Sequence, residues 1–206
     1  MGVCALRQRA VFLDRDGVIN RATVRNGKPY PPARPSELEI LPGVSEALCR
    51  LQAADFRLIV VTNQPDVARG TQSRETVETM HEMLRKAGLP ITAFYVCYHD
   101  GPANCDCRKP RPGLLLSAAL DHLLDLKGSY MVGDRWRDIE AGQRAGCRAF
   151  FVDYAYDEPQ PQPPFVGVTS LAEAADRILG TFVPGPLMPE RPFYDYDQPP
   201  QGEDIR

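Results

Sequence analysis

The sequence lacks a long apolar segment, and this absence limits the classes of protein that it can encode. No stretch of its 206 residues approaches the length of apolar chain that a membrane-spanning helix needs. The first ten residues, which carry Arg7 and Arg9, also lack the apolar run of a secretory signal peptide. We therefore expect a protein of the cytoplasm that has no membrane partner.

The chain also lacks an excess of basic residues. It holds 24 Lys and Arg against 27 Asp and Glu, which gives a formal net charge of -3. Broad binding of nucleic-acid backbones is therefore not expected, whereas a small phosphorylated substrate needs only a few local cations. With 43% hydrophobic residues, a chain of 206 residues has enough material for the core of one domain. We expect this domain to act as a monomer.

The segment Val11–Asn20 joins a short apolar strand to two carboxylates. Val11–Leu13 fits a buried strand, and Asp14, Asp16 and Gly17 follow it directly. Two carboxylates this close repel each other unless a cation lies between them or one holds a proton. The pair therefore indicates a divalent ion such as Mg2+, a nucleophile with a partner acid, or both. Taken alone, the segment could equally be a surface turn, because Asp and Gly are common turn residues.

Strand-like and helix-like segments alternate along the rest of the chain. Buried strands are expected at 56–61, 93–97, 129–132 and 148–152, with a candidate last strand at 165–168. Helical spacing of apolar residues is found at 44–51, 73–87, 112–126, 138–145 and 170–179. The Pro- and Gly-rich segment 21–35 is expected to be an irregular loop over the carboxylates. The alternation predicts an α/β fold with a central parallel sheet that helices cover on both faces.

Polar side chains follow three of the expected strands at the point where each strand ends. Asp14 and Asp16 follow the first strand, Thr62 and Asn63 follow the second, and Asp134 follows strand 129–132. Because the carboxyl ends of parallel strands lie at the same edge of a sheet, these side chains should meet there. Their placement favours a functional site over a surface turn.

The six cysteines could form three disulfides, but their spacing favours a metal site. Three cysteines and a histidine fall within eleven residues, and such clustering in a cytosolic chain is typical of metal ligands. Three thiolates and one imidazole are a complete tetrahedral set for structural Zn2+, with no open position for catalysis. A redox or chance cluster is the competing interpretation. The four side chains are Cys97, His99, Cys105 and Cys107.

The remaining thiols and the C-terminal segment carry no clear chemistry. Cys4, Cys49 and Cys147 are interpreted as ordinary thiols, with Cys49 and Cys147 buried. We expect one domain over residues 1–183, followed by a Pro-rich tail at 184–206. The tail is either solvated or packed through its aromatic residues Phe193, Tyr194 and Tyr196.

Taken together, the motifs resemble in order and spacing the four motifs of the haloacid dehalogenase (HAD) superfamily of phosphotransferases, over residues 11–152. They are Asp14-Arg-Asp16-Gly, Thr62-Asn63, Lys109-Pro110 and Gly133-Asp134. The sequence is most similar to the zinc-containing group that includes D-glycero-D-manno-heptose 1,7-bisphosphate phosphatase and the histidinol-phosphatase domain. The resemblance implies a Rossmann-like fold with a zinc-bound loop. Only about 45 residues separate the first two motifs, which is too few for a cap domain.

The resemblance implies a role for each motif residue. Asp14 would attack phosphorus to form an aspartyl-phosphate, and Asp16 would protonate the leaving sugar oxygen and then activate water. Asp134, Asp14 and the backbone carbonyl of Asp16 would hold Mg2+. Thr62 would bind the transferring phosphoryl oxygens, and Lys109 would neutralise charge that develops in the transition state. Without the neighbouring motifs, Lys109 would be interpreted as a solvated surface lysine.

Other residues are candidates for the substrate pocket. Arg108 resembles the family position that contacts a second, non-transferred phosphate, and the cysteine cluster directly before it would fix where it points. Asp138 is either a partner behind Mg2+ or an acid at the start of a helix. Weaker candidates for the same polar pocket are Asn20, Asn63, Arg69 and Arg135.

The resemblance implies a Mg2+-dependent phosphatase that removes the C7 phosphate of a heptose 1,7-bisphosphate in nucleotide-heptose synthesis. Histidinol phosphate is the alternative substrate, because the short link between His99 and Cys105 also resembles histidinol-phosphatase domains. A catalytically inactive, zinc-organised binding protein is the alternative from another class. The presence of Asp14, Asp16 and Lys109 argues against this last interpretation, as does Asp134.

Overall fold

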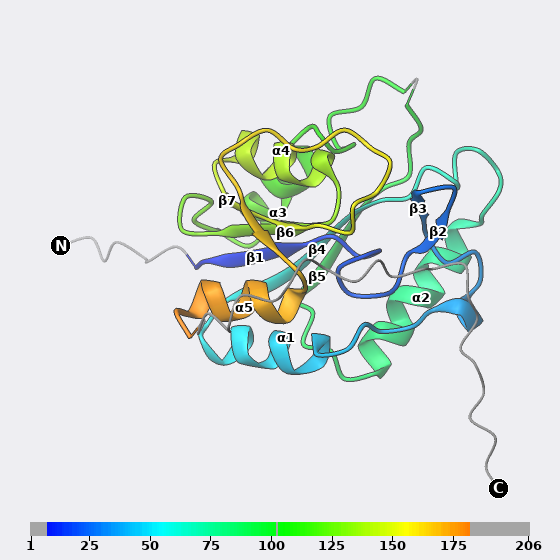
Figure 1. Ribbon diagram of the computed structural model, residues 1–206. Helices are drawn as coiled ribbons and strands as arrows, with labels where there is room; N and C mark the ends of the chain where they lie inside the picture. Colours follow the sequence, from blue (N-terminus) through cyan, green and yellow to red (C-terminus); the bar gives the residue numbers. More distant parts are fainter. Residues whose placement is uncertain (1–7, 102, 182–206) are drawn as a thin grey trace, which may run out of the picture.

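Six parallel strands form the centre of the computed structural model, which describes residues 8–101 and 103–181 (Figure 1). Their order across the sheet is β5-β4-β1-β6-β7-β8, so that β1 lies between β4 and β6. The expected parallel α/β sheet is confirmed, including its last short strand. The bounds are β1 Ala10–Leu13, β4 Arg57–Asn63, β5 Ala93–Cys97, β6 Tyr130–Gly133, β7 Arg148–Val152 and β8 Val166–Val168.

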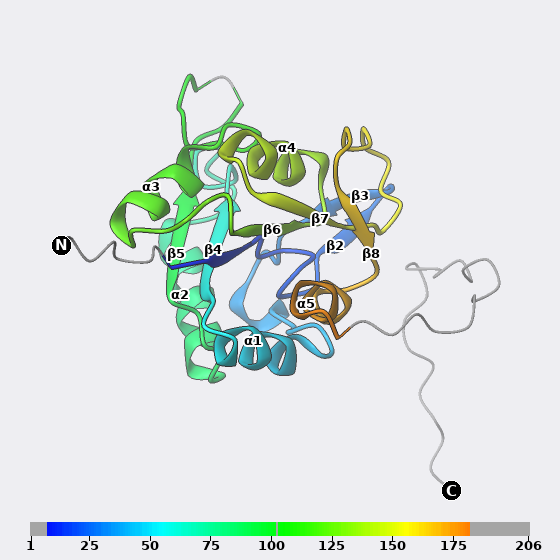
Figure 2. The ribbon, with the colours of Figure 1, turned by 90° about the vertical axis from the view of Figure 1, so that its left-hand side faces the viewer.

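Helices cover both faces of this sheet (Figures 1 and 2). Helices α1 (Val44–Ala53), α2 (Arg74–Lys86) and α5 (Leu171–Leu179) lie on one face, and α3 (Gly113–Asp121) and α4 (Trp136–Ala145) lie on the other. Alternate side chains of β1 point into the two cores: Val11 and Leu13 pack with α1 and α5, while Phe12 packs with α3 and α4. Because both faces are buried, β1 is apolar at every position.

Two helices start at serine caps, and the bounds of α3 and α4 are among those that differ from the expected ranges. Ser73 and Ser170 each accept a hydrogen bond from the backbone N–H three residues later. Helix α3 ends at Asp121, whereas residue 126 was the expected end. Two residues after Asp121, Leu123 adopts a left-handed φ of 53°, and the chain turns back toward the sheet. Helix α4 begins at Trp136, two residues before the expected start.

The composition of the segment 21–35 predicts an irregular loop. The structure differs, because part of this segment is regular. It contains a two-stranded antiparallel hairpin of β2 (Thr23–Arg25) and β3 (Lys28–Tyr30), followed by the 3-10 helix η1 (Pro35–Glu37). Asn26 and Gly27 connect the strands with φ angles of 50° and 71°. Both positive values fit the Asn-Gly turn that matches the twist of a hairpin.

The described part of the chain holds no inserted cap domain between β1 and β4, where only the hairpin, η1 and α1 are found. No helix within the described ranges is long and apolar enough to cross a membrane. Cys147 is buried as expected, but the expectation for Cys49 was wrong, because its position on α1 faces solvent. The proposed tail at 184–206 and its aromatic residues lie outside the described residues.

Candidate active site

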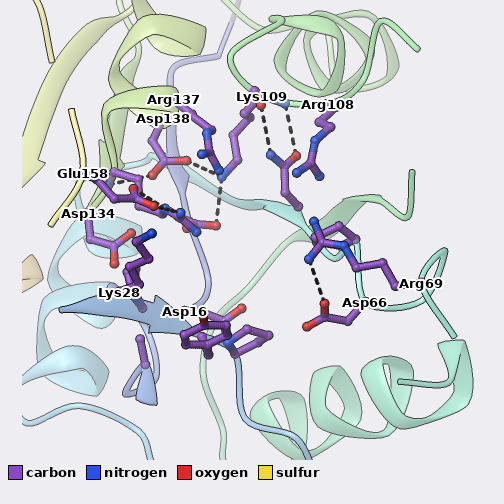
Figure 3. A pocket seen from close by; sticks show the side chains of 18 residues that line it. Asp16, Lys28, Asp66, Arg69, Arg108, Lys109, Asp134, Arg137, Asp138 and Glu158 are labelled. Atoms are coloured by element: carbon purple, nitrogen blue, oxygen red, sulfur yellow. Dashed lines mark hydrogen bonds and ion pairs between the residues drawn. The ribbon is translucent and has the colours of Figure 1, made fainter. Parts of the chain in front are cut away.

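The polar residues that follow β1, β4 and β6 meet at one edge of the sheet. Leu13 pairs with Val60 of β4 and with Val132 of β6, and the backbone N–H of Asp14 donates to the Val132 carbonyl at 2.9 Å. The chain order reverses on either side of β1, and such reversal points are where open α/β sheets bind ligands. A pocket of about 270 Å³ opens at this edge, and residues of the β2–β3 hairpin form one of its walls (Figure 3).

Lys109 lies at the floor of this pocket and is 2% exposed. Its Nζ lies 2.9 Å from Asp14 Oδ1 and 2.5 Å from Asp138 Oδ1, and it donates to the Val61 carbonyl at 2.7 Å (Figure 3). Burial opposes the charge of Lys109, but the two carboxylates outweigh burial and raise its pKa. The side chain of Asn63 accepts from the backbone N–H of Lys109 and donates to its carbonyl, both at 3.1 Å. These contacts fix a buried cation beside Asp14.

Three buried carboxylates lie close together at the pocket floor, and two of them, Asp14 and Asp138, contact Lys109. Asp14, Asp134 and Asp138 each offer an oxygen, and these oxygens lie within 4.8 Å of one another. Burial, only partly offset by Lys109, raises the pKa of Asp14 to about 6. Burial and the charge of Asp14 raise the pKa of Asp134 well above its ordinary value. One ammonium against three carboxylates leaves this floor short of positive charge.

The carboxylate of Asp134 has the properties of a cation ligand. Both of its oxygens are buried and neither meets hydrogen-bond geometry with a partner in the described chain, although the Tyr156 hydroxyl lies near enough to favour its charged form. A side chain at Gly17 would place its Cβ 1.9 Å from Asp134 Oδ2, and the φ of +86° at Gly17 also favours glycine. Oxygen ligands with unmet acceptor capacity fit a hard divalent cation such as Mg2+.

Asp16 lies at the wall of the pocket and its carboxylate is held by three side chains. It accepts from Asn20 Nδ2 at 2.9 Å, from Gln64 Nε2 at 2.8 Å and from the Arg15 guanidinium at 3.0–3.1 Å. Asn20 is fully buried behind Asp16, so its geometry gives no support to the predicted contact with substrate. Thr62 is 1% exposed, and its hydroxyl accepts from Gln64 at 2.9 Å.

Two of the candidate arginines are already paired with carboxylates. Arg69 contacts Asp66 at 3.1 Å and Asp100 at 2.7 Å. Arg135 forms an ion pair with Glu158, a residue of the loop after β7. Both arginines line the pocket, but much of their charge is offset within the protein.

Three other cations of the pocket rim have no carboxylate partner among the residues that the structure describes. They are Lys28 on β3, Arg108 directly before Lys109, and Arg137 on α4 (Figure 3). Arg137 is half-buried, and its Cζ lies over the ring of Trp136, 5.2 Å from the ring centroid. Burial, together with the charge of Arg135, lowers the pKa of Arg137. The rim therefore has charge available for an anionic group of a ligand.

The Cys/His cluster forms a compact set of four potential metal ligands. Cys107 Sγ lies 3.1 Å from Cys97 Sγ and 3.3 Å from His99 Nδ1, and Cys97 Sγ lies 3.8 Å from Cys105 Sγ. A tetrahedral site with Zn–S bonds of about 2.3 Å has sulfur–sulfur distances of roughly 3.7 Å, so the cluster could hold zinc. Arg108 Nη1 donates to the His99 carbonyl at 3.0 Å, which joins the cluster to the pocket rim.

One contact and several residues of the site were not identified from the sequence. The ion pair of Asp138 with Lys109 joins residues 29 positions apart, and only their shared place at the sheet edge could have indicated it. Gln64 follows the Thr62-Asn63 motif directly and could have been found from that position. Glu158 lies in a loop with no regular pattern, and Lys28 and Arg137 resemble ordinary surface cations in the sequence.

Comparisons with known proteins place this geometry in a family. A family model described as HAD-hydrolase-like matches residues 106–174. The chain is 35% identical over 148 residues to a D-glycero-beta-D-manno-heptose-1,7-bisphosphate 7-phosphatase of Bordetella bronchiseptica, which covers 70% of this chain and 80% of the relative. It is 38% identical over 148 residues to the enzyme of the same name from Escherichia coli, over 66% of this chain and 74% of the relative.

Solved structures give the same result. The crystal structure of D,D-heptose 1,7-bisphosphate phosphatase from B. bronchiseptica, in complex with magnesium and phosphate, superimposes with a TM-score of 0.70 and 31% identity over 84% of this chain and 98% of that chain. A D,D-heptose 1,7-bisphosphate phosphatase from Burkholderia thailandensis matches with a TM-score of 0.60 and 27% identity, over 84% and 99%. The predicted resemblance is confirmed: the chain belongs to the heptose-bisphosphate phosphatase family of the HAD superfamily, a family of phosphoric monoester hydrolases.

Proposed function

We propose that this protein is a Mg2+-dependent phosphatase that removes the C7 phosphate of D-glycero-D-manno-heptose 1,7-bisphosphate. The observation that carries the proposal is the buried cluster of Asp14, Asp134, Asp138 and Lys109 at the pocket floor. The names of the relatives from B. bronchiseptica and E. coli support this substrate. The cytoplasmic location and the monomeric state expected from the sequence stay predictions.

The arrangement supports a reaction in two steps. Asp14 attacks phosphorus, the bond between phosphorus and the C7 oxygen breaks, and Asp16 donates its proton to the leaving oxygen. Asp16 then takes a proton from water, which attacks the aspartyl-phosphate, releases inorganic phosphate and restores Asp14. Lys109, held by Asp138, stabilises charge on the transferring phosphoryl group. The Thr62 hydroxyl oxygen accepts a hydrogen bond from Gln64. The hydroxyl proton is not used in this bond, so it can be donated to a phosphoryl oxygen.

We propose that Asp14 and Asp134, with the backbone carbonyl of Asp16, hold the Mg2+. When bound, the ion offsets repulsion between the Asp14 carboxylate and the phosphate dianion. The crystal structure of the B. bronchiseptica relative was determined with magnesium and phosphate, which supports this assignment. Asp138 also contributes an oxygen to the buried cluster, but its short contact with Lys109 makes it the partner that orients the lysine.

The unpaired cations of the rim suit the second phosphate of a bisphosphate. Arg108 was predicted to contact this group, and Lys28 and Arg137 add two cations on other walls of the same pocket. Arg135 and Arg69 contribute less positive charge, because Glu158 and Asp66 offset it. A substrate with one phosphate at the floor and another at the rim would use both regions.

We propose a structural Zn2+ in the Cys/His cluster, which fixes the loop that carries Arg108 and Lys109. A chelator that removes zinc should lower the melting temperature and the kcat/KM for the bisphosphate together. Re-addition of Zn2+ should restore both values, while Mg2+ is kept in excess throughout. An unchanged fold and unchanged activity in the zinc-depleted protein would contradict the assignment.

The substrate is tested by steady-state kinetics on purified protein. We expect kcat/KM for heptose 1,7-bisphosphate to exceed that for histidinol phosphate at least about 100-fold. The unpaired side chains of the rim are cations, and they would not pair with the amine of histidinol phosphate. Phosphorus NMR of the product should show loss of the C7 ester and retention of the C1 ester. A preference for histidinol phosphate, or release of the C1 phosphate, would overturn the proposal.

A further inference from the structure

A fully buried arginine lies directly behind the proposed acid, Asp16. Arg15 has an exposed fraction of 0%, and a charged side chain at such a depth must be paired to offset the cost of leaving water. Its Nε and Nη2 donate to the Asp16 carboxylate at 3.0–3.1 Å. Its Nη1 lies 3.3 Å from Nε2 of His81, which is also fully buried. One guanidinium therefore connects the pocket wall to helix α2.

The hydrogen bonds of His81 determine which of its nitrogens carries the proton. An arginine can only donate, so Nε2 of His81 must accept from Arg15 and Nδ1 must carry the hydrogen. Nδ1 lies 3.4 Å from Glu78 Oε2, an acceptor that suits this tautomer. Burial, with the charge of Arg15 as a smaller cause, lowers the pKa of His81 to about 4, so the ring is neutral at neutral pH. The His81 ring also stacks on the Phe94 ring, with 4.3 Å between the two ring centroids.

This arrangement is not explained by the packing of α2. The other buried residues of the helix are Val77, Met80 and Leu84, and an apolar side chain at position 81 would continue their face. A buried imidazole costs free energy unless its polar atoms are satisfied, and here they are satisfied by Arg15 on one side and Glu78 on the other. The polar residue is therefore matched to the guanidinium that it contacts.

We propose that His81 is a positioning residue that holds the Arg15 guanidinium in place and thereby fixes the Asp16 carboxylate at the pocket wall. The inference rests on the proposed role of Asp16 as the acid. Loss of the acceptor at position 81 leaves Nη1 without a partner, and Arg15 then reorients to satisfy it. Asp16 receives two of its three side-chain contacts from elsewhere, from Asn20 and Gln64, so its position is loosened and not lost.

The test uses variants that separate the hydrogen bond from the ring. His81→Phe keeps an aromatic ring against Phe94 but removes the acceptor, whereas His81→Gln keeps an acceptor near the position of Nε2. His122→Phe is the matched control, because His122 packs edge-on against Tyr95 on the opposite face of the sheet. The values compared are kcat/KM for an unactivated sugar phosphate and for p-nitrophenyl phosphate.

The two substrates differ in their need for the acid. The sugar alkoxide must be protonated as it leaves, whereas p-nitrophenolate leaves without a proton, and kcat/KM reports only the steps up to this departure. We expect His81→Phe to lower kcat/KM for the sugar phosphate about 10-fold or more and for p-nitrophenyl phosphate less than about 2-fold. His81→Gln should recover most of the loss, and His122→Phe should change neither value.

Equal losses on both substrates, or no loss on either, would overturn the proposal. Nitrogen NMR of the wild-type protein gives a second test that does not depend on how the variants fold. It should show His81 protonated at Nδ1 and not at Nε2 near neutral pH, and the opposite tautomer would also overturn the proposal. Any sugar phosphate that the wild type hydrolyses serves for the kinetic comparison, so failure on heptose 1,7-bisphosphate counts against the proposed substrate alone.

Discussion

The floor and the rim of the pocket carry opposite charge. The floor holds three clustered carboxylates and the single ammonium of Lys109, and all four side chains are at most 10% exposed. At the rim, Lys28, Arg108 and Arg137 have no carboxylate partner within the described parts of the chain. The floor therefore lacks positive charge and the rim has it in excess. Such a pocket suits a divalent cation at one end and an anion at the other.

The difference in burial also decides how strongly each region acts. Charges at the dry floor interact through a low effective dielectric, whereas those at the half-open rim are screened by water and salt. Changes at the floor should therefore have large effects that respond little to ionic strength. Changes at the rim should be smaller and should weaken as salt is added.

The largest effect is expected from Asp14→Asn. The amide cannot form the phosphoryl ester, so kcat should fall at least about 10⁴-fold, as is typical when a nucleophile is removed. The melting temperature of the metal-free protein should not fall, because the substitution removes a buried charge that is already disfavoured. The exposed Asp55→Asn variant is the control and should keep full activity. Undiminished turnover by Asp14→Asn would refute the nucleophile assignment.

Lys109→Met should have the next largest effect. The methionine keeps the length of the side chain but leaves Asp14 and Asp138 without their buried cation. We expect kcat to fall about 10²–10³-fold and the free energy of unfolding to fall by about 3–5 kcal/mol. The measurements are steady-state kinetics and denaturant unfolding, with the exposed Lys127→Met as the control.

A second variant separates stability from catalysis at the floor. Adding Asp138→Asn to Lys109→Met removes one of the two stranded carboxylates, so stability should partly recover while activity does not. Recovery of activity in the double variant would contradict a direct role of Lys109 in the reaction.

The floor could be predicted from the sequence because its residues follow strands. Asp14 and Asp134 each come at the end of an apolar run, and the parallel sheet brings such positions together whatever lies between them. The Cys/His set could be identified for a different reason: its four members lie within eleven residues of the sequence. What the sequence could not give is the pairing of Asp138 with Lys109, because this contact depends on how α4 sits against the sheet.

The rim could not be predicted to the same depth. Its charge depends on which arginines find carboxylates, and Glu158 reaches Arg135 from a loop that has no regular pattern. Lys28 reaches the pocket only because Asn26 and Gly27 turn the segment 21–35 into a hairpin, a signal that we did not recognise in its composition. Asn20 shows the opposite case, since this polar residue near the motif is fully buried and donates to Asp16, and its predicted contact with substrate stays a prediction.

Arg137→Ala tests whether the rim recognises a second anion. We expect kcat/KM for heptose 1,7-bisphosphate to fall about 10-fold, while kcat/KM for a sugar with a single phosphate at the reacting position changes less than about 2-fold. The difference should shrink as the salt concentration rises. Arg148→Ala is the control, because Arg148 is exposed at the start of β7 and does not line the pocket. An equal loss on both substrates would mean that Arg137 acts on the floor.

The smallest effect concerns Mg2+ and pH. The folded-state pKa of Asp14 is raised from 3.8 to about 6, so the stability that it contributes is present below pH 3.8 and is lost as the pH rises through about 6. The metal-free protein should therefore lose stability over this window, and bound Mg2+ should restore it, since the ion binds the ionised carboxylates. With Mg2+ at about ten times its Kd, the stabilisation at pH 7.5 is about 1.4 kcal/mol, or a shift in Tm of about 3–5 °C.

At pH 5 Asp14 is largely protonated in the folded protein without metal, and the raised pKa of Asp134 acts in the same direction, so the same Mg2+ concentration should shift Tm by less than about 1 °C. Calorimetric scans at both pH values, with NaCl at matched ionic strength as the control, measure the difference. The Asp14→Asn variant should show a smaller dependence of the Mg2+ shift on pH, because it lacks the Asp14 carboxylate, which has a pKa of about 6. An equal shift at pH 5 and pH 7.5 would show that the ion binds outside the buried carboxylates. The floor would then not be the cation site that distinguishes it from the rim.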